Sequence, residues 1–481
     1  MSTEGEVAAK EAHELHRALG PWQLIALGIG AIIGAGIFVI TGHAAATYAG
    51  PGVVVSFMIA GLGCFFAGLC YAEFASMIPV AGSAYTYTYA TMGRFLAWFI
   101  GWNLVLEYLA AASTVAVGWA GYLVQLLSQL GITIPRALST APLAMTSLTD
   151  ISFTGAFLNL PAMAVIALAT TMLVIGIKAS AQFNGIMVII KLVIVLLVIG
   201  FGLPLIMGAN LDPFIPPNTG TWGEFGWSGV FRATGVIFFA YIGFDAVSVA
   251  AQEARNPQRD MPIGILGSLL ICTVLYILMS LTMTGLAPYT SLGVAYPVFV
   301  AINNAGPQLA WLGFLVNVGA VVGLASVVLV LLLGQSRVFY AMSRDGVIPP
   351  LYCKIHPTFR TPWIGTIVTG MFAALLAGLV PLSILGELVS IGTLLAFTIV
   401  CAGILILRVA RPNYHRPFRT PAVWIVAPLG MGMCIFMMAF LPLDTWLRLV
   451  VWTIIGLVIY FAYGSRNAKP PQFVLSKQPA E

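Results

Sequence analysis

Charge is what this sequence has least of. Only 37 of its 481 residues, or 8%, carry a formal charge, 21 of them basic and 16 acidic, where a soluble domain has about 25%. The mean hydropathy of the chain is +0.99, and no long polar block interrupts its apolar sequence. This composition excludes a soluble globular protein and predicts an all-α polytopic membrane protein, whose surface is solvated mostly by lipid. The net charge of +5 is scattered over loops, which gives no support to nucleic-acid binding.

Reactive motifs are also scarce. Of six cysteines, five fall inside apolar segments and Cys353 lies in a basic loop, so neither extracellular disulfides nor a metal cluster is expected. The patterns GxxxxGK[ST], HExxH and CxxC are all absent, which leaves an ATP-driven pump and a zinc enzyme without a supporting motif. We therefore expect a protein that is not an enzyme and holds no cofactor, metal or catalytic residue.

Long apolar stretches fill the chain instead. A helix needs about 20 apolar residues to cross the roughly 30 Å of bilayer hydrocarbon. Twelve stretches qualify: 22–47, 53–78, 95–127, 158–177, 184–207, 229–254, 262–287, 308–341, 363–380, 384–408, 422–441 and 446–464. We predict one membrane domain of twelve helices over 21–464, with a segment 1–20 and a tail 465–481 on the same side of the membrane.

The basic residues give a separate test of this topology. Residues 1–20 are too polar for a cleavable signal peptide, so the N-terminus is expected in the cytoplasm. With that orientation 17 of the 21 Lys and Arg residues fall on the cytoplasmic side, three fall outside (Arg136, Arg232 and Arg448), and Lys191 lies inside a helix. The split follows the positive-inside rule, and one missed helix in the middle would invert every later loop.

Two apolar segments are interrupted near their middles. The first contains Gly28-Ile29-Gly30-Ala31-Ile32-Ile33-Gly34-Ala35-Gly36, and the sixth contains Phe238-Phe239-Ala240-Tyr241-Ile242-Gly243-Phe244-Asp245. A repeat unit of five helices enters the membrane in the opposite sense the second time, which is the inverted repeat of secondary transporters. We predict repeats over 21–207 and 229–408, with the two helices of 422–464 outside them.

The four glycines of the first segment have two readings. One is an unwound stretch whose N–H groups, at the start of the next half-helix, receive a carboxylate. The other is close packing, since Gly30 and Gly34 also form a GxxxG contact motif. The matching interruption in the sixth segment favours a binding site.

Lys191 is the most conspicuous charge at membrane depth. It lies about 10–14 Å from the cytoplasmic end of its helix at the helical rise. A charge at this depth costs ~2.5–3.5 kcal/mol on insertion scales, and losing the proton relieves the cost. Lys191 is then either an amine that carries the coupling proton or a fixed cation bonded to carbonyls of a broken helix, and the two readings can describe one residue in two states.

Acidic and aromatic side chains complete the inventory. Glu107 and Asp245 are candidate partners for a buried cation. Glu107 could contact a substrate side chain or make structural hydrogen bonds, and Asp245 could cap the lower half of the sixth helix or contact the substrate. Glu73 is expected to be an ordinary interfacial carboxylate near the inner end of its helix. The tyrosines of 85–89 are expected to be interfacial belt residues.

Taken together, these residues resemble the amino acid–polyamine–organocation superfamily and, within it, bacterial members of the cationic amino acid transporter family. The resemblance runs from about Leu19 to Gly464. It rests on the glycine motif that ends in Ile37-Phe38, Tyr71-Ala72-Glu73-Phe74-Ala75 with Gly82-Ser83-Ala84-Tyr85, the motif of 239–245, Asn256-Pro257-Gln258-Arg259-Asp260-Met261-Pro262, and Ser343-Arg344-Asp345-Gly346. It implies the five-plus-five inverted repeat and amino acid uptake coupled to protons.

The resemblance also implies a substrate site. The substrate carboxylate would meet backbone N–H groups of Gly34, Ala35 and Gly36, and Lys191 would carry the proton. The α-amino group would meet the carbonyls of Ile32, Phe239, Ala240 and Ile242, and Glu107 is a candidate for the side-chain contact. Many relatives have Ser or Thr where this chain has Ala35, so a hydroxyl contribution is absent here.

The cargo stays open at this stage. The apolar run 327–333 favours small or apolar side chains, whereas Glu107 argues for a cation. The expected partners are an L-amino acid, protons and membrane lipid, with no obligate protein partner evident and the cell membrane as location. An amino acid/polyamine exchanger and a non-transporting sensor are the alternatives, although the tail of 17 residues offers no signalling domain. A channel would need a pore lined by rings of polar or charged residues, and the charged residues at membrane depth in this chain do not supply them.

Overall fold

The computed structural model describes residues 19–77, 83–145, 151–176, 181–245, 247 and 254–469. Most of the predicted segments 1–20 and 465–481, and most of the lower half of the sixth helix, therefore lie outside the described residues. The α-helices are α2 Pro21–Ile32, α3 Thr41–Ala44, α4 Val53–Met77, α5 Ser83–Thr91, α6 Arg94–Gln129, α7 Leu160–Ile175, α8 Ala181–Gly202, α9 Gly226–Ile237, α11 Pro257–Leu286, α12 Pro297–Asn304, α13 Ala310–Arg344, α14 Trp363–Leu379, α15 Leu382–Ala410, α16 Val423–Ala439, α17 Leu443–Ile459 and α18 Ser465–Asn467.

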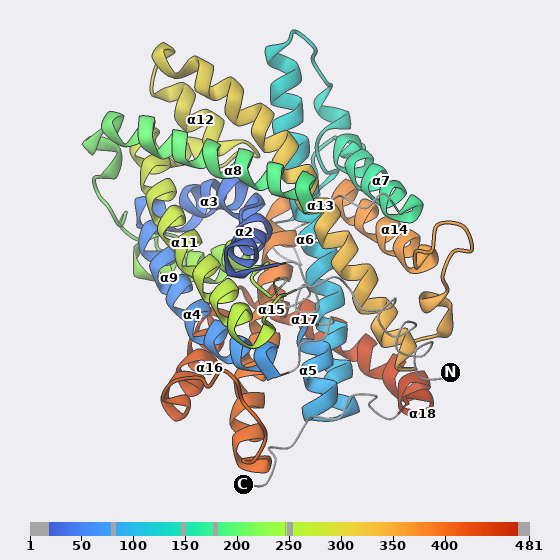
Figure 1. The fold of residues 1–481 in the computed structure, drawn as a ribbon. Coiled ribbons are helices and arrows are strands. Elements are labelled where there is room, and N and C mark those ends of the chain that lie inside the picture. The colour runs from blue at the N-terminus through green and yellow to red at the C-terminus, as the bar shows by residue number, and fades with distance from the viewer. Residues whose placement is uncertain are drawn as a thin grey trace.

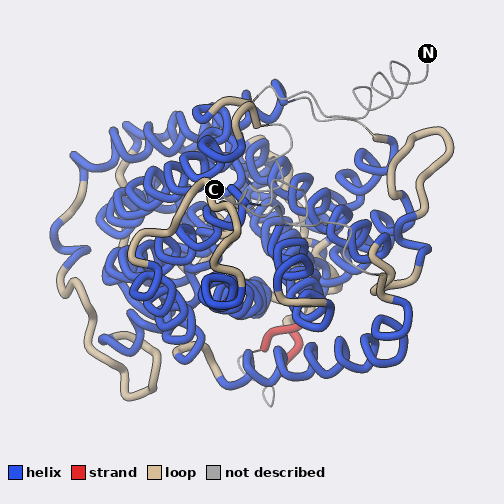
Figure 2. The backbone as a smooth tube through the Cα atoms, turned by 60° about the horizontal axis from the view of Figure 1, so that its bottom comes forward, coloured by secondary structure: helices blue, strands red, loops and turns tan. Residues whose placement is uncertain are grey.

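Short helical turns connect or extend these helices. Three are π-helical: η1 Gly36–Ile40, η2 Ala45–Ala49 and η12 Tyr460–Gly464. The 3₁₀ turns are η3 Gly50–Gly52, η4 Arg136–Leu138, η5 Leu203–Leu205, η6 Gly208–Leu211, η7 Phe238–Tyr241, η9 Tyr289–Leu292, η10 Pro307–Leu309 and η11 Pro350–Cys353. One small hairpin, β1 Leu143–Met145 paired antiparallel with β2 Ile151–Phe153, lies at the periphery in Figure 2 and is not predicted by the hydropathy.

The apolar helices follow the predicted segments. Among the described residues, seven stretches are long and apolar enough to cross a membrane: Gly36–Met77, Arg94–Gln129, Gly185–Leu205, Pro257–Leu286, Pro307–Arg344, Leu382–Ala410 and Leu443–Asn467. Of four shorter apolar helices in these residues, α2 falls on the first predicted segment, which Gly36–Met77 also overlaps, and α7, α14 and α16 fall on 158–177, 363–380 and 422–441. The number of membrane crossings itself stays a prediction.

Helices far apart in the sequence pack into two groups (Figure 1). On the left, α4 packs against α11 and α9, and α11 also contacts α2. On the right, α13 packs along α6, and α14 along α7. Helix α8 touches α2, α11 and α13, while α15 touches α6, α4 and α16. The first apolar segment therefore lies close to helices of both groups.

Helix α11 shows where hydropathy misplaces a boundary. The apolar stretch begins at Pro262, but the helix begins one turn earlier, at Pro257. Proline is favoured at a first helical position because its missing N–H has no partner to lose. The Asp260 carboxylate accepts a hydrogen bond from the backbone N–H of Asn256 at 3.2 Å and so stabilises this polar first turn.

Candidate functional site

The first apolar segment is broken where the glycine motif predicts. Helix α2 ends at Ile32, and Ile33 has an extended backbone with ψ 97°. Helical structure resumes with the π-helical turn η1 at Gly36. The first N–H groups of a helix have no partner within it, so the stretch between Ile33 and Gly36 presents donors at the N-terminal end of η1.

The sixth segment is broken at the matching place. Helix α9 passes into the 3₁₀ turn η7, after which Ile242 is extended with ψ 136° and Gly243 has φ +118°. A Cβ atom at Gly243 would lie 2.7 Å from the carbonyl carbon and oxygen of Ala31. Both the positive φ and the close approach require glycine here.

The two breaks are in direct contact. A Cβ atom at Gly36 would lie 2.3 Å from the Cα of Ala240. Gly28 and Gly30 likewise face the side chains of Ser268 and Val188 without room for a side chain of their own. Among the described residues, the glycines of this motif all have negative φ. The glycines thus serve close packing and frame the break at the same time, so the two readings of the motif are not exclusive.

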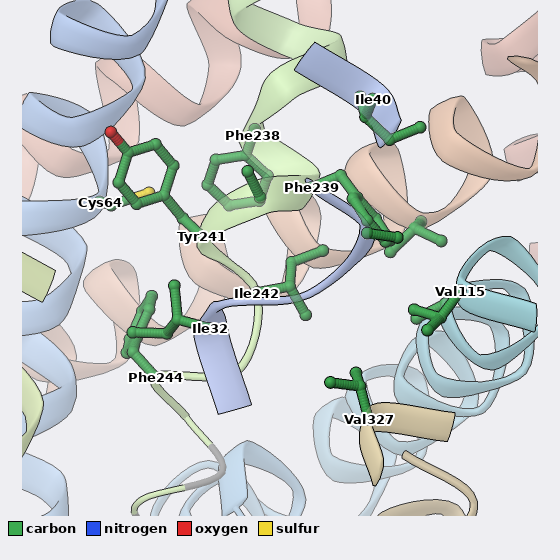
Figure 3. Close-up of a cluster of buried hydrophobic side chains, with 14 of the residues drawn as sticks. Ile32, Ile40, Cys64, Val115, Phe238, Phe239, Tyr241, Ile242, Phe244 and Val327 are labelled. Carbon is green, nitrogen blue, oxygen red and sulfur yellow. The ribbon is translucent and has the colours of Figure 1, made fainter. Parts of the chain in front are cut away.

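A small apolar cavity lies beside the crossed breaks, with a volume of about 20 Å³. Its lining comes from four helical regions: Ala31, Ile32, Gly34, Ala35, Gly36, Ala111, Val115, Phe239, Ile242, Val327 and Leu331. Figure 3 shows Val115 of α6 and Val327 of α13 across from Ile242. The volume suffices for about one water molecule, so an amino acid enters only if the surrounding helices move apart.

Tyr276 on α11 joins the two breaks and is missed by the sequence analysis. Its hydroxyl lies 2.8 Å from the carbonyl oxygens of both Ile32 and Ala240, so its one proton has two possible acceptors. The Phe239 carbonyl accepts from the Ile242 N–H at 3.2 Å. Each carbonyl oxygen has a second lone pair, so these oxygens can still accept from a ligand ammonium group. A tyrosine within an apolar stretch carries no signal that marks such a role.

Lys191 on α8 binds the break in the first segment. Its Nζ donates to the carbonyl oxygens of Gly30 at 2.7 Å and Ile33 at 3.0 Å, and the residue is 2% exposed. The Lys191 stem packs on Gly323 of α13, where a Cβ atom would lie 2.6 Å from Lys191 Cγ. The amine therefore holds α8 to the end of α2, a geometry that both readings of Lys191 allow.

The two candidate acids, Glu107 and Asp245, lie close enough to interact electrostatically. The described hydrogen bonds of Lys191 go to backbone carbonyls and not to either acid. Asp245 is buried and accepts a hydrogen bond from the Tyr108 hydroxyl at 3.3 Å. Glu107 on α6 is 1% exposed, and neither carboxylate oxygen has a hydrogen-bond partner among the described residues. Glu107 lies one helical turn before Ala111, which lines the cavity, whereas Glu107 itself and Ala240 do not appear in its lining.

Glu73 differs from the sequence prediction of an ordinary interfacial carboxylate. It is fully buried near the C-terminal end of α4 and accepts two hydrogen bonds from Arg408 of α15, at 3.1 and 2.8 Å. Arg416 Nε lies 3.3 Å from the same carboxylate, and the Thr420 N–H donates to it at 2.7 Å. Because a buried carboxylate needs partners of this kind, Glu73 anchors the loop that follows α15.

The tyrosines of α5 are not a membrane-interface belt either, since Tyr85, Tyr87 and Tyr89 are buried. The Tyr85 hydroxyl donates to Asp345 at the end of α13 at 3.0 Å. Burial raises the pKa of the Asp345 carboxyl, and the hydrogen bond from Tyr85 opposes that rise. Tyr87 stacks on Phe74 of α4, with ring centroids 5.6 Å apart. These contacts join α5 to α4 and to the end of α13.

A second charge cluster lies at the opposite end of α15. Glu387 is flanked by Arg232 of α9 at 3.8 Å and Arg448 of α17 at 3.6 Å, and it accepts a hydrogen bond from Thr445 at 2.7 Å. The Arg232 guanidinium also stacks over the Tyr48 ring, 4.4 Å from its centroid. Two of the three arginines expected outside are therefore ion-paired: Arg232 joins the two broken segments to α15, and Arg448 joins α17 to α15.

Comparison with known proteins agrees with this architecture. The sequence profile of the amino acid permease family matches residues 19–462. The chain is 46% identical to the branched-chain amino acid permease BcaP of Bacillus subtilis (strain 168), over 97% of this chain and 96% of that protein. It is 44% identical to the methylthioribose transporter of the same organism, over 96% of each chain. It is 37% identical to the vacuolar cationic amino acid transporter 4 of Arabidopsis thaliana, over 83% of this chain and 65% of that protein.

Proposed function

This chain belongs to the amino acid permease family of polytopic helical membrane proteins, and on that premise we propose that it imports amino acids through the cell membrane by proton symport. The proposal is carried by one observation: the only lysine at membrane depth in the described helices donates to two carbonyl oxygens of the broken first segment, beside the cavity. A change of charge on Lys191 therefore acts directly on the backbone that would hold the substrate.

The proposed architecture is twelve helices in two inverted repeats, with both termini in the cytoplasm. Its support is the packing of helices at equivalent places in the two repeats: α4 with α11, α6 with α13, and α7 with α14. The two broken segments, which are the first helices of the repeats, cross at Gly36 and Ala240. Broken helices in corresponding positions are the usual binding site of such transporters.

We assign substrate recognition to the backbone. The carboxylate would lie against the N–H groups of Gly34, Ala35 and Gly36, where the positive end of the following helix favours an anion. The ammonium group would lie against the carbonyls of Ile32, Phe239, Ala240 and Ile242. The lining of the cavity by these segments supports this placement.

The cargo best supported is a neutral amino acid with a branched apolar side chain. The walls that face the broken segments are Ala111, Val115, Val327 and Leu331, which offer no buried acceptor for a cationic side chain. Two relatives are named branched-chain amino acid permeases, one 46% and one 36% identical. Methylthioribose is the second candidate, since a relative 44% identical is named for its transport.

Alternating access would follow from the protonation of Lys191. A proton from the more acidic outside would keep the amine charged and bonded to Gly30 and Ile33, which holds the break in its substrate-binding form. Loss of the proton inside would weaken these bonds, free α2 from α8 and favour release. In this cycle the proton only has to stabilise the substrate-binding form more than the releasing form.

The experiment is uptake of labelled leucine into proteoliposomes with an imposed pH gradient, acidic outside. The parent should concentrate leucine and lose accumulation when the gradient is collapsed. Lys191→Ala should lose the response to the gradient while it keeps measurable leucine binding, because backbone recognition does not need the amine. Lys191→Arg should bind but fail to accumulate, since guanidinium does not release its proton.

Three outcomes would contradict the proposal in different ways. Accumulation by Lys191→Ala equal to the parent would move the proton to Glu107 or Asp245. Uptake only into liposomes preloaded with amino acid would indicate an exchanger. Binding without any uptake would indicate a sensor.

Competition for leucine uptake tests the cargo. Valine and isoleucine should compete within about tenfold of leucine, and lysine and methylthioribose should not. Val327→Phe should weaken leucine binding at least about tenfold, because the ring fills a cavity of about 20 Å³. Leu329→Phe, about 200° around the helix from Val327, is the matched control and should leave binding unchanged. Stronger competition by methylthioribose than by leucine would overturn the assignment.

A further inference from the structure

A groove distant from the central cavity lies where the first turn of α11 meets the loop between α15 and α16. Its volume is about 760 Å³, far larger than the central cavity. The groove is lined among others by Arg259, Ile263 and Leu266 of α11 and by His415, Pro417 and Phe418 of the loop. One half of the lining is cationic or polar and the other half is apolar.

The polar half carries an excess of positive charge. Arg259 and His415 line it, and Arg411 and Arg419 flank His415 in the loop. No acidic residue occurs between Glu387 and Asp444 in the sequence. Asp260 is buried and engaged by the N–H of Asn256. The groove therefore complements an anion such as a phosphate group.

The apolar half continues along the surface of α11. Ile263, Leu270, Ile271 and Val274 are exposed and follow the groove at helical spacing. From Arg259 to Leu270 the helix rises roughly 16 Å, about the thickness of one leaflet of bilayer hydrocarbon. An acyl chain could thus lie on this face while its headgroup phosphate lies at Arg259.

The loop wall of the groove is held rigid from behind. The Arg416 guanidinium donates to the carbonyls of Pro412, Tyr414, Leu407 and Arg411 at 2.8–3.2 Å. It also lies against Glu73, which fixes the loop on α4. A wall fixed before binding lowers the ordering cost of a ligand.

We propose that this groove is a binding site for an anionic phospholipid, with the phosphate at Arg259 and His415 and an acyl chain along α11. Basic pockets between membrane helices are suited to such headgroups. The site does not depend on which substrate the protein transports or on how transport is driven.

The test is titration of the purified full chain in neutral detergent with phosphatidylglycerol or phosphatidylcholine of the same acyl chains, with bound lipids counted by native mass spectrometry. The parent should bind one phosphatidylglycerol at least about tenfold more tightly than phosphatidylcholine. Arg259→Gln should abolish this preference, and His415→Gln should reduce it. Arg360→Gln, an exposed arginine in the loop before α14, is the matched control and should keep the preference.

Two results would overturn the proposal. An undiminished preference in both variants would mean that the groove binds no anionic lipid and takes a protein segment or nothing. Complete displacement of phosphatidylglycerol by equimolar glycerol 3-phosphate would mean that a soluble phosphate is the ligand and that the apolar half has no part. Unfolding midpoints without lipid, measured for every variant, separate loss of the site from loss of the fold.

Discussion

At the scale of single residues, Gly36 is the position where the two broken segments leave the least space. An added Cβ would lie 2.3 Å from the Ala240 Cα, and backbone cannot move aside as the end of a side chain can. At Gly34 the same atom would lie 3.4 Å from a methyl group of Val327, which is close to ordinary contact. One methyl group thus has different consequences two residues apart.

We predict that Gly36→Ala weakens leucine binding at least about tenfold, because overpacking of this kind costs about 1–3 kcal/mol and acts on the break itself. Gly200→Ala on α8, where an added Cβ meets nothing within 4 Å, is the matched control and should bind within about threefold of the parent. Isothermal titration of both purified variants checks this. Equal affinities for the two variants would mean that the crossing of the breaks is not part of the substrate site.

The residues of the break could be predicted from the sequence, but two supporting residues could not. Glycines in an apolar segment and a lysine at membrane depth are unusual in lipid, so Gly34, Gly36 and Lys191 stand out. Tyr276 and Gly323 belong to ordinary apolar helices. They matter only because folding brings α11 and α13 against the break, where they contact Ile32 and Lys191.

At the scale of elements, Glu73 joins α4, α15 and the loop that follows α15. Its carboxylate is fully buried, and its partners are Arg408, Arg416 and the N–H of Thr420. Removing the charge would leave two guanidinium groups without their shared anion. Breaking a buried pair in this way costs about 3–5 kcal/mol.

Glu73→Gln should therefore lower the free energy of unfolding by about 3 kcal/mol, measured by thermal or denaturant unfolding in detergent. The double variant Glu73→Gln/Arg408→Gln should be less destabilised than the sum of the two single variants, because the two side chains interact directly. Additive effects in this cycle would show that the ion pair does not contribute to stability.

Helix boundaries differ from the predicted segments where polar residues belong to a helix. Hydropathy finds the apolar body of α11 but not its first turn, since Gln258, Arg259 and Asp260 read as loop. It also reads 85–89 as interface, whereas α5 buries its tyrosines against α4 and the end of α13. In both places tertiary contacts, which are not encoded in local hydropathy, decide the outcome.

At the scale of the whole molecule, the distribution of Lys and Arg sets the expected orientation in the membrane. Counting basic residues predicts both termini in the cytoplasm. In a Cys353→Ser background, which removes the one partly exposed cysteine, a cysteine at Ser465 should stay unlabelled by an impermeant thiol reagent added to intact cells. A cysteine at Thr133, in the exposed loop after α6, should be labelled. The opposite pattern would invert the orientation.

The closed cavity has a consequence for affinity. A protein whose cavity has about 20 Å³ binds cargo only in the fraction of molecules that are open, so the apparent dissociation constant is the intrinsic one divided by that fraction. With about 1% of molecules open, the apparent affinity falls about a hundredfold.

Ion pairs that the cargo never meets, such as Glu387 with Arg232 at one end of α15 and Glu73 with Arg408 at the other, would change the open fraction wherever they are stronger in one state than in the other. Two permeases with identical pocket residues can therefore differ widely in apparent affinity through their ion pairs alone.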